Sequence, residues 1–484
     1  MNRFRNGLAY CALALLSACA VGPDYVRPVA PVPAAYKELE GWKRAEPQVA
    51  ASGAPWWSIY KDPILDQLVS QVDVNNQNLK AAEAAYRQAQ ALVRETRAGY
   101  FPAVSLDASG QRSKPGSNSS FSSSRIRNSY DLSASATWEL DVWGRIRRAV
   151  ESDTATAQAS AADLASARLS AQAQLATAYF QLRVDDEIKR LLDATAAAYQ
   201  RSLEIAQNRY AVGVATRADV AQAQAQLETT RSQAVGIGVQ RAQLEHAIAV
   251  LMGGPPATFS IAPVELAAGV PVVPTGVPSE LLERRSDVAS AERLMAAANA
   301  EVGVAEAAYF PAITLSASYG FASAAIDNLL RAASRVWSVG AQGTQPLFDG
   351  GLRGAQVDFA RAAYDQRVAA YRQIVLTAFQ QVEDNLSTLR ILEEQAALQQ
   401  GAVLAAQEAE RLTLNQYEAG TVAYTSVVTA QAAALSARQS ALTILQTRLG
   451  ASVALVQALG GGWDSAQLPT RDAVSGRPAE VATP

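Results

Sequence analysis

Few residues in this 484-residue chain could do chemistry, and their spacing matches no reactive arrangement. The one histidine, His246, follows Glu245 in a helical segment; no nucleophile elbow, phosphate-binding loop or cluster of metal ligands is recognisable. The acidic run Asp185–Glu187 is expected on a solvated helix face, with Lys189 and Arg190 as its partners. We therefore predict a protein that is not an enzyme and that has no metal and no cofactor.

Cys19 is the exception, because its context predicts covalent attachment of lipid. Two arginines precede an apolar run, Leu8–Leu16, which has the length of a signal sequence and is too short to span a bilayer. The run ends in LSAC at 16–19, which resembles the processing motif of bacterial lipoproteins. We expect residues 1–18 to be a lipoprotein signal peptide. We expect Cys19 to carry more acyl chains than the two attachment signals that stable membrane anchoring needs. The alternative is an ordinary signal peptide, with Cys19 a bystander.

The residue after Cys19 indicates the location of the protein, and the composition excludes some classes of partner. Ala20, rather than aspartate, follows the cysteine, which by resemblance to bacterial lipoproteins favours the outer membrane. Removing residues 1–18 leaves 40 basic against 45 acidic residues, a net charge of −5, so there is no electrostatic case for nucleic acid. Both cysteines lie in the first 19 residues, which excludes a structural disulfide framework.

The chain contains an internal duplication. Residues 98–110 (AGYFPAVSLDASG) match 307–319 (AAYFPAITLSASY) at an offset of 209, and NRYAVG at 208–213 matches NQYEAG at 415–420 at an offset of 207. The expected units are an N-terminal tether and extended segment (19–60), a first repeat (61–252), a Pro-rich connector (253–278), a second repeat (279–460) and a C-terminal tail (461–484). Each repeat is expected to contain a helix, two strands and a long helical hairpin.

Each repeat carries an unusually long helical segment. No Gly or Pro interrupts Arg145–Val212, and 68 helical residues would reach roughly 100 Å. The corresponding segment of the second repeat, 355–419, contains only Gly401. Gly213 and Gly420 are expected to be turns into return helices. Ala, Leu and Val at heptad-like spacing suit coiled-coil packing, which leaves a soluble coiled-coil scaffold as an alternative.

Four segments alternate apolar and polar residues with the period of a strand: 103–111, 130–141, 312–322 and 335–347. They are about ten residues long with aromatic residues near their ends, which is typical of transmembrane β-strands. Ala134 and Ala317 are expected to face lipid, and Ser135 and Ser316 to face water. A soluble sheet with one buried face would show the same alternation.

Four strands do not close a barrel, and lipid does not tolerate an open sheet edge. The chain is therefore expected to oligomerise, with eight strands from two copies or twelve from three. An eight-stranded barrel is filled by its own side chains, whereas twelve strands lined by small polar residues leave an aqueous pore. A pore joined to long helices indicates a conduit.

These features resemble the TolC-like outer-membrane factors, and within them the lipoprotein outer-membrane subunits of resistance-nodulation-division (RND) efflux pumps of the OprM and NodT type. The segments that carry the resemblance are CAVGPDYVRP at 19–28, WW at 56–57, DP at 62–63, YFP at 100–102 and 309–311, LDVWGR at 140–145, LLERR at 281–285, PLFDGG at 346–351, YEAG at 417–420 and LGGGW at 459–463. The resemblance implies a mixed α and β membrane protein: a trimeric 12-stranded transmembrane β-barrel continued by a periplasmic α-helical coiled-coil barrel. One departure is Ser286, where the family usually has proline; we expect this serine to cap a helix.

The resemblance also implies a function. The chain would be the outer-membrane channel of a tripartite efflux pump, a passive exit duct for drugs or other small molecules. It would form a homotrimer, anchored in outer-membrane lipid, that docks to a periplasmic adaptor protein and an inner-membrane RND transporter. One alternative is the exit duct of a type I protein secretion system, against which lipidation and the LGGGW motif weigh. The other is a lipid-anchored coiled-coil scaffold without a pore.

A gate at the periplasmic tip is implied as well. By matching positions, Asp219 and Tyr417 correspond to members of the link that closes the channel at rest, and Tyr210 and Tyr424 flank the same turns. The alternative for Asp219 is local, because its spacing from Thr216 is that of a capping box.

The chain departs from TolC at three positions of this link. Val422 stands where TolC carries a basic residue, and Ser426 and Thr429 replace acidic residues of its constriction. Closure is therefore expected to rest on hydrogen bonds and on apolar and aromatic packing.

Overall fold

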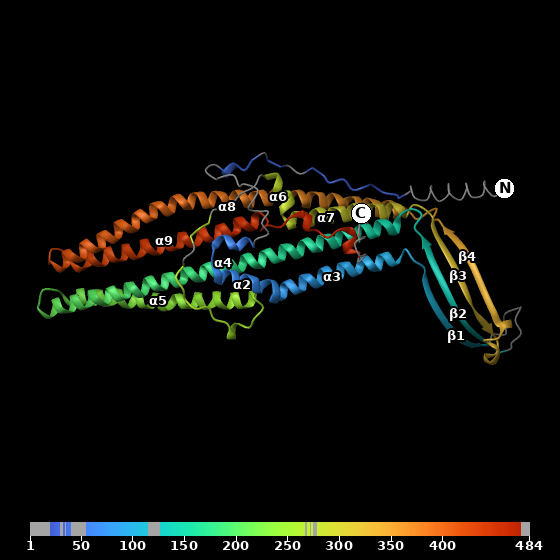
Figure 1. Cartoon of the computed structure of the whole chain (residues 1–484), viewed down its shortest axis with the longest axis horizontal. Helices are drawn as coiled ribbons and strands as arrows, with labels where there is room; N and C mark the ends of the chain where they lie inside the picture. The colour runs from blue at the N-terminus through green and yellow to red at the C-terminus, as the bar shows by residue number, and fades with distance from the viewer. Residues whose placement is uncertain are drawn as a thin grey trace, which may run out of the picture.

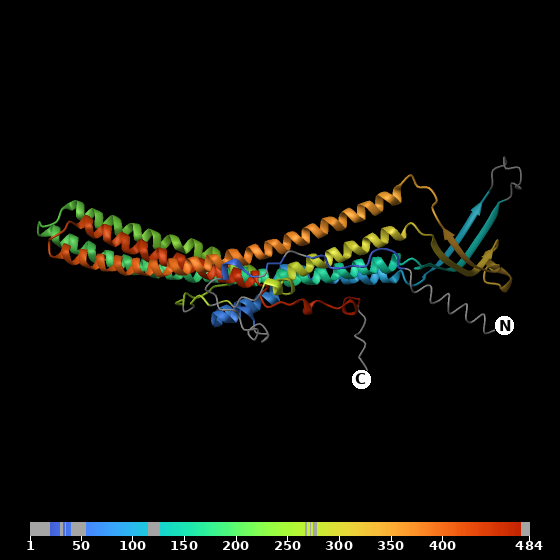
Figure 2. The same cartoon turned by 90° about the horizontal axis from the view of Figure 1, so that it is seen from above.

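The computed structural model describes residues 20–29, 32–33, 35–39, 55–114, 126–266, 269–271, 273 and 278–475. The predicted signal peptide and Cys19 lie outside the described residues, as do residues 115–125 between the first two predicted strands and parts of the connector and of the C-terminal tail. The described part is strongly elongated: a β-sheet forms one end, and two long helical hairpins extend to the other (Figure 1). Shorter helices pack around the middle of the hairpins (Figure 2).

The helices and strands follow one another twice in the same order. The first repeat contains α2 (Pro63–Asn75), α3 (Gln77–Ala98), β1 (Ala103–Ser113), β2 (Arg127–Leu140), α4 (Arg145–Ala211) and α5 (Arg217–Leu251). The second contains α6 (Pro278–Arg284), α7 (Ser286–Ala307), β3 (Ala312–Ser323), β4 (Arg335–Thr344), α8 (Leu352–Glu418) and α9 (Tyr424–Ala458). The short helix α10 (Arg471–Val474) follows, and 3-10 turns lie at Lys37–Leu39, Trp56–Tyr60, Pro256–Thr258, Ile326–Asn328, Ala332–Ser334 and Ser465–Gln467.

The four strands form one antiparallel sheet in the order β1-β2-β3-β4, so β1 and β4 are its edges within the chain. Ala136 of β2 pairs with Ala317 of β3, and Thr344 at the end of β4 pairs with Ala312 at the start of β3. β4 ends at Thr344 rather than at residue 347, because Pro346 has no N–H to continue the ladder. β1 and β2 extend farther toward their connecting loop than the alternation indicates.

Each long helix starts at a glycine with a left-handed backbone, φ 80° at Gly144 and 92° at Gly351. A preceding aspartate covers the free amides of the first turn. Asp141 accepts hydrogen bonds from the backbone amides of residues 146 and 147, at 2.8 and 3.0 Å. Asp349 accepts from those of residues 351 and 353, at 3.0 and 3.3 Å. Both helices therefore begin at a fixed point directly beneath the sheet.

The return helices end in the same way in both repeats. Asn76, between α2 and α3, donates from Nδ2 to the carbonyl oxygen of Leu251 at the end of α5, at 2.7 Å. Arg285, between α6 and α7, donates from Nη1 to the carbonyl oxygen of Ala458 at the end of α9, at 2.9 Å. The duplication is therefore visible in the packing as well as in the sequence.

Four helices form a row below the sheet, in which α3 packs on α4, α4 on α7 and α7 on α8. In Figure 2, α7 (yellow) lies between α4 and the part of α8 (orange) that diverges toward the sheet. The main apolar clusters lie farther along, in the middle of the molecule, around residues such as Leu65, Leu175 and Phe180 in one case and Val288, Met295 and Leu386 in the other.

The first described residues fasten the two repeats to each other. Arg148 of α4 donates to the carbonyl oxygens of Val21 and Gly22, at 3.2 and 3.1 Å, and forms an ion pair with Asp24 at 2.9 Å. Gly22 lies so close to α7 that a Cβ atom there would be 2.4 Å from the Cα atom of Gly303. A side chain at residue 22 would therefore push this segment off the helices.

The acidic run Asp185–Glu187 is not a solvated face, so that expectation is wrong. Asp185 and Asp186 are buried, and Asp186 pairs with Arg241 of α5 at 2.8 Å. Glu187 accepts a hydrogen bond from the backbone amide of Leu266, which belongs to the connector between the repeats. The connector covers this part of α4 and removes it from water. Burial, together with the neighbouring Asp186, raises the pKa of Asp185 to about 6.

Ser286 does not cap a helix, contrary to expectation. It is the first residue of α7, and the cap position belongs to Arg285, which makes no side-chain cap hydrogen bond. An arginine side chain only donates hydrogen bonds, so Arg285 cannot accept one from the amides of the first turn, and its guanidinium reaches Ala458 and Gln381 instead.

Candidate functional site

One face of the sheet is polar across all four strands. Ser105, Ser135, Ser318 and Ser338 stand opposite one another in adjacent strands and form one row. Their hydroxyl groups pair across the strands, Ser105 with Ser135 and Ser318 with Ser338, each at 2.8 Å between Oγ atoms. Asp107, Asp131 and Glu139 lie on the same face. Small hydroxyl and carboxylate groups suit a water-filled space.

The opposite face is apolar, and the register fixes which residues form it. One row contains Val104, Ala136, Ala317 and Val339, and the next contains Leu106, Ala134, Tyr319 and Trp337. Ala134 and Ala317 are therefore on the apolar face, and Ser135 and Ser316 are on the polar one. Many of these apolar side chains are exposed in the single chain, Trp337 and Val339 among them.

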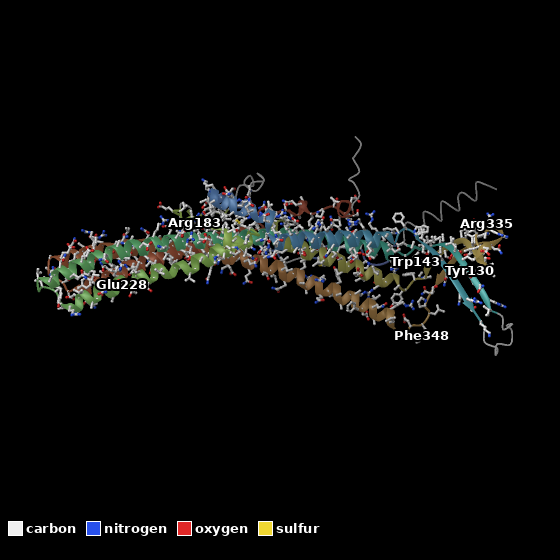
Figure 3. The ribbon with its side chains drawn as sticks, turned by 90° about the horizontal axis from the view of Figure 1, so that it is seen from below. Tyr130, Trp143, Arg183, Glu228, Arg335 and Phe348 are labelled. Carbon is white, nitrogen blue, oxygen red and sulfur yellow. The ribbon has the colours of Figure 1, made fainter. Side chains whose placement is uncertain are left out.

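An aromatic junction joins the sheet to the helices. The ring of Trp143, which follows β2, stacks on Phe310, which precedes β3, with a centroid distance of 4.8 Å. Its Nε1 donates to the carbonyl oxygen of Pro311 at 2.8 Å. Figure 3 shows Trp143 where the helices meet the sheet, with Tyr130 and Arg335 farther along the strands. The backbone amide of Val21 donates to the carbonyl oxygen of Trp143 at 3.1 Å, so the segment that follows Cys19 begins at this junction.

The other end of the molecule is built from the two hairpin turns. Gly213 and Gly420 both have left-handed backbones, with φ of 77° and 80°, which only glycine adopts without strain. Beside the turns, Tyr417 and Tyr424 are buried with their rings edge to face at 5.1 Å. They lie in an apolar cluster shared by both hairpins. Burial is the main cause that raises the pKa of Tyr424 to about 12.

Arg209 is a residue of the tip that the sequence analysis missed. Its guanidinium lies over the ring of Tyr417, with Cζ 4.9 Å from the centroid, and its Nη1 donates to the carbonyl oxygen of Glu418 at 3.0 Å. It thereby ties α4 to the end of α8. One feature of the sequence could have pointed to Arg209: the two repeats differ here, because the matching residue in the second repeat is Gln416.

The other two predicted tip residues have local roles in the single chain. Asp219 forms a capping box with Thr216: its Oδ2 accepts from the Thr216 amide at 2.8 Å, and its own amide donates to Thr216 Oγ1 at 3.2 Å. Tyr210 is 47% exposed and does not join the buried cluster. The structure thus brings Tyr417 and Tyr424 together and leaves Asp219 and Tyr210 outside them.

Within the described ranges, no helix is long and apolar enough to cross a membrane. Across the same part of the chain, no group of three or more His, Cys, Asp or Glu residues is placed to hold a metal ion.

Known proteins share this architecture. The family described as "Outer membrane efflux protein" matches residues 68–254 and 277–461. The toluene efflux pump outer membrane protein TtgC of Pseudomonas putida is 34% identical over 454 residues, which cover 93% of this chain and 94% of TtgC. Outer membrane protein OprJ of Pseudomonas aeruginosa is 31% identical over 96% of this chain and 97% of its own length.

Solved structures agree with the sequence matches. The outer-membrane channel OprN has a TM-score of 0.86 at 31% identity, covering 92% of this chain and 100% of OprN. The MtrE outer membrane channel of Neisseria gonorrhoeae, solved in its open state, has a TM-score of 0.82 at 27% identity, covering 92% of this chain and 99% of MtrE.

A sheet with one polar and one apolar face, continued by long helical hairpins, defines an outer-membrane channel of the efflux class. The chain belongs to the family of outer membrane efflux proteins. Its location is the outer membrane, and its family consists of channel components rather than enzymes. The predicted resemblance to the TolC-like outer-membrane factors is confirmed.

Proposed function

We propose that three copies of this chain form a passive exit duct through the outer membrane. The single observation that carries the proposal is the sheet, which has a polar face, an apolar face and two edges that pair with no other described strand. Successive strands alternate in direction, so β4 of one copy is antiparallel to β1 of the next, and a ring of copies closes without a break. Three copies supply twelve strands, enough to enclose water, whereas eight are filled by their own side chains.

The helical hairpins would continue this barrel as a periplasmic tunnel. Helices of 67 residues, α4 and α8, reach roughly 100 Å from the sheet. The relatives are named as parts of efflux pumps, including pumps for toluene and antibiotics. By that likeness the duct docks to a periplasmic adaptor and an inner-membrane RND transporter, which supply the energy and select the cargo. Drugs or other small molecules are the cargo class.

Acylation of Cys19 would anchor each copy to the inner leaflet. Support comes from the next two residues, because the amide of Val21 is held by the carbonyl of Trp143 at the junction between sheet and helices. An acyl chain attached at this level enters the bilayer beside the barrel. Replacing Cys19 with serine should abolish labelling by a fatty-acid probe, and labelling that persists in the variant would remove the assignment.

The tip would be the gate of the duct. Tyr417, Tyr424 and Arg209 hold the two hairpins of one chain together, and Asp219 and Tyr210 lie beside the same turns. The double variant Tyr417→Ala, Asp219→Ala should raise the conductance of the resting channel and sensitise cells to large antibiotics. Wild-type conductance in a folded double variant would place the gate elsewhere.

Channel recordings test the main proposal against its alternatives. Purified protein should form heat-resistant trimers and conduct ions in planar bilayers, whereas a coiled-coil scaffold would not conduct. A type I secretion duct would also conduct, but deletion of the duct would then block export of a protein rather than raise drug sensitivity.

A pair of substitutions tests which face meets lipid. Arginine at Ala134 should cost roughly 2–4 kcal/mol at mid-bilayer and lower the yield of trimer. Arginine at the adjacent Ser135 should mainly change conductance. Equal effects from the two variants would overturn the assignment of the faces.

A further inference from the structure

The two faces of the sheet carry charges of opposite sign. On the polar face, the strands hold three carboxylates, those of Asp107, Asp131 and Glu139, and one cation, Arg127. On the apolar face, the four strands, all of which the structure describes, hold no acidic residue, and their two charged residues are both arginines. The acidic groups therefore face one side of the sheet and these two arginines face the other.

The two arginines also lie at the same end of the apolar face. This is the end where loops join β1 to β2 and β3 to β4, and we call it the loop end. Arg335, the first residue of β4, stands opposite Phe321, and Arg112, near the end of β1, stands opposite Asn128. Both arginine side chains are exposed. Figure 3 shows Arg335 at the end of the sheet that is remote from the helices.

The other end of the apolar face, next to the helices, differs. Its strand residues are uncharged: Val104, Leu140, Ile313 and Gly343, with Trp138 in the next row. Long cationic side chains can extend from an apolar surface into water at either end. Contact with water alone therefore does not explain why the arginines occur at the loop end only.

The arginines lie at the height where lipid headgroups begin. Arg335 is four residues from Val339, and Arg112 is six residues from Leu106, in the two central rows of the apolar face. At the rise of an extended strand these separations are about 13 and 20 Å. The apolar band of a membrane barrel is about 25 Å tall, so both guanidinium groups, on their flexible stems, reach its edge.

We propose that the loop end of the apolar face binds the phosphate groups of the glycolipid that forms the outer leaflet. The inference rests on the proposed function, which places the helices in the periplasm and the loop end at the outer surface of the cell. In such a leaflet the phosphates lie at the boundary between acyl chains and sugars. A guanidinium is planar and always charged, and its fork of N–H donors fits a phosphate.

The residues around the arginines suit a lipid headgroup. Asn128 lies beside Arg112 on the neighbouring strand, where its carboxamide can bind a sugar hydroxyl. On β3 the rings of Tyr319 and Phe321 pack edge to face, with a centroid distance of 6.3 Å. Trp337 stands opposite Tyr319 and is 74% exposed. Aromatic side chains at this height are typical of the boundary between acyl chains and headgroups.

The arginines belong to the two edge strands of the sheet. In the proposed ring, β4 of one copy pairs with β1 of the next, so Arg335 and Arg112 of different copies flank each junction. The positive charge is then gathered at three places around the barrel. We expect three phosphorylated glycolipids to be held by each trimer.

Binding of the purified full-length protein to the glycolipid tests the proposal. The probe is outer-leaflet glycolipid with two phosphates, presented in detergent micelles, and the comparison is the same glycolipid after removal of its phosphates. Wild-type protein should bind the phosphorylated form at least tenfold more tightly. The double variant Arg112→Gln, Arg335→Gln should lose this preference and bind both forms equally. Inorganic phosphate at the same concentration should not compete, because it has no acyl chains to lie on the apolar face.

Arg127→Gln is the matched control, because this arginine lies at the same end of the sheet on the polar face. It should bind the phosphorylated glycolipid within twofold of wild type. All three arginines are exposed in the single chain, so circular dichroism should show the same helix and strand content in every variant.

The outcomes separate this inference from the proposed duct. A conducting wild-type trimer whose affinity is the same with and without phosphates would overturn the inference alone. So would a folded double variant that keeps the preference for phosphates, or an Arg127→Gln variant that loses it equally. Wild-type protein that neither forms trimers nor conducts, but keeps a preference that depends on Arg112 and Arg335, would overturn the duct and support the lipid site.

Discussion

Tyr210 and Tyr417 occupy matching positions at the tips of the two hairpins, yet their surroundings are opposite. Tyr417 is 4% exposed and lies under the guanidinium of Arg209, whereas Tyr210 is 47% exposed. The two turns also begin their return helices differently: α5 starts with the capping box of Thr216 and Asp219, whereas α9 follows Ala423, which provides no side-chain cap.

Duplicated residues therefore take their roles from the residues that surround them. The second hairpin faces the first inside the chain, so Tyr417 is enclosed by α4 and α9. Tyr210 is turned away from that contact. A residue type repeated in both copies is therefore no guide to function until the contacts of each copy are known.

The largest expected effect is the loss of the Tyr417 ring. Tyr417→Ala should cost about 3 kcal/mol or more, as removal of a buried aromatic ring does, and Tyr210→Ala should cost little. Hydrogen exchange of amides at the tip should accelerate about a hundredfold in the first variant only. Tyr417→Phe is the control, because the buried hydroxyl has no hydrogen-bond partner among the described residues, and it should be neutral. Equal effects at 210 and 417 would erase the distinction between the copies.

The next effect concerns Asp185, an acidic residue whose counterpart 207 residues later in the second repeat is the apolar Leu392. The pKa of Asp185 is about 6 in the folded protein, above its ordinary value, so the folded state holds the proton more tightly than the unfolded state. The contribution of Asp185 to stability should therefore become more favourable as the pH falls from 7 through 6 toward 4. Asp185→Asn should stabilise the protein at pH 7 by on the order of 2 kcal/mol, allowing for screening, and the gain should vanish near pH 4. Melting temperatures at several pH values measure this, and a gain independent of pH would contradict it.

A smaller effect on stability is expected from removing Arg209, whose contacts with Tyr417 and Glu418 have no equivalent at Gln416, the matching position of the second repeat. Arg209→Ala removes a cation–π contact and a hydrogen bond to the Glu418 carbonyl, together about 1–2 kcal/mol. Single-channel recordings should show more frequent openings, whereas Gln416→Ala should behave as wild type. Indistinguishable recordings would mean that Arg209 does not hold the hairpins closed.

The smallest effect concerns the cap. Asp219→Ala should cost about 1 kcal/mol, because the first turn of α5 loses one partner of its capping box. Ser426→Ala, the matching change in the second copy, should have no effect, since no side chain caps α9. Amide exchange within the first turn of α5 and of α9 distinguishes the two.

Local patterns in the sequence were enough to predict the helices and strands. They were not enough to predict contacts between residues that are far apart in the chain. Alternation locates the four strands, and Gly144, Gly213 and Gly420 mark helix ends, because a strand face and a glycine turn are properties of neighbouring residues. The burial of Asp185 could not be read in this way, since the connector that covers it lies some 80 residues farther along. Likewise, nothing next to Tyr417 in the sequence indicates that Arg209 will lie on its ring.

The pairing of β2 with β3 sets the order in which the chain folds. Tyr130 and Ser323 pair although about 190 residues separate them, so this contact is slow to close from an unfolded chain. The strand pairs β1–β2 and β3–β4 and the two helical hairpins are local, and we expect them to form first. Until β2 joins β3, each half-sheet has an additional unpaired edge, and unpaired strand edges readily pair with those of other chains.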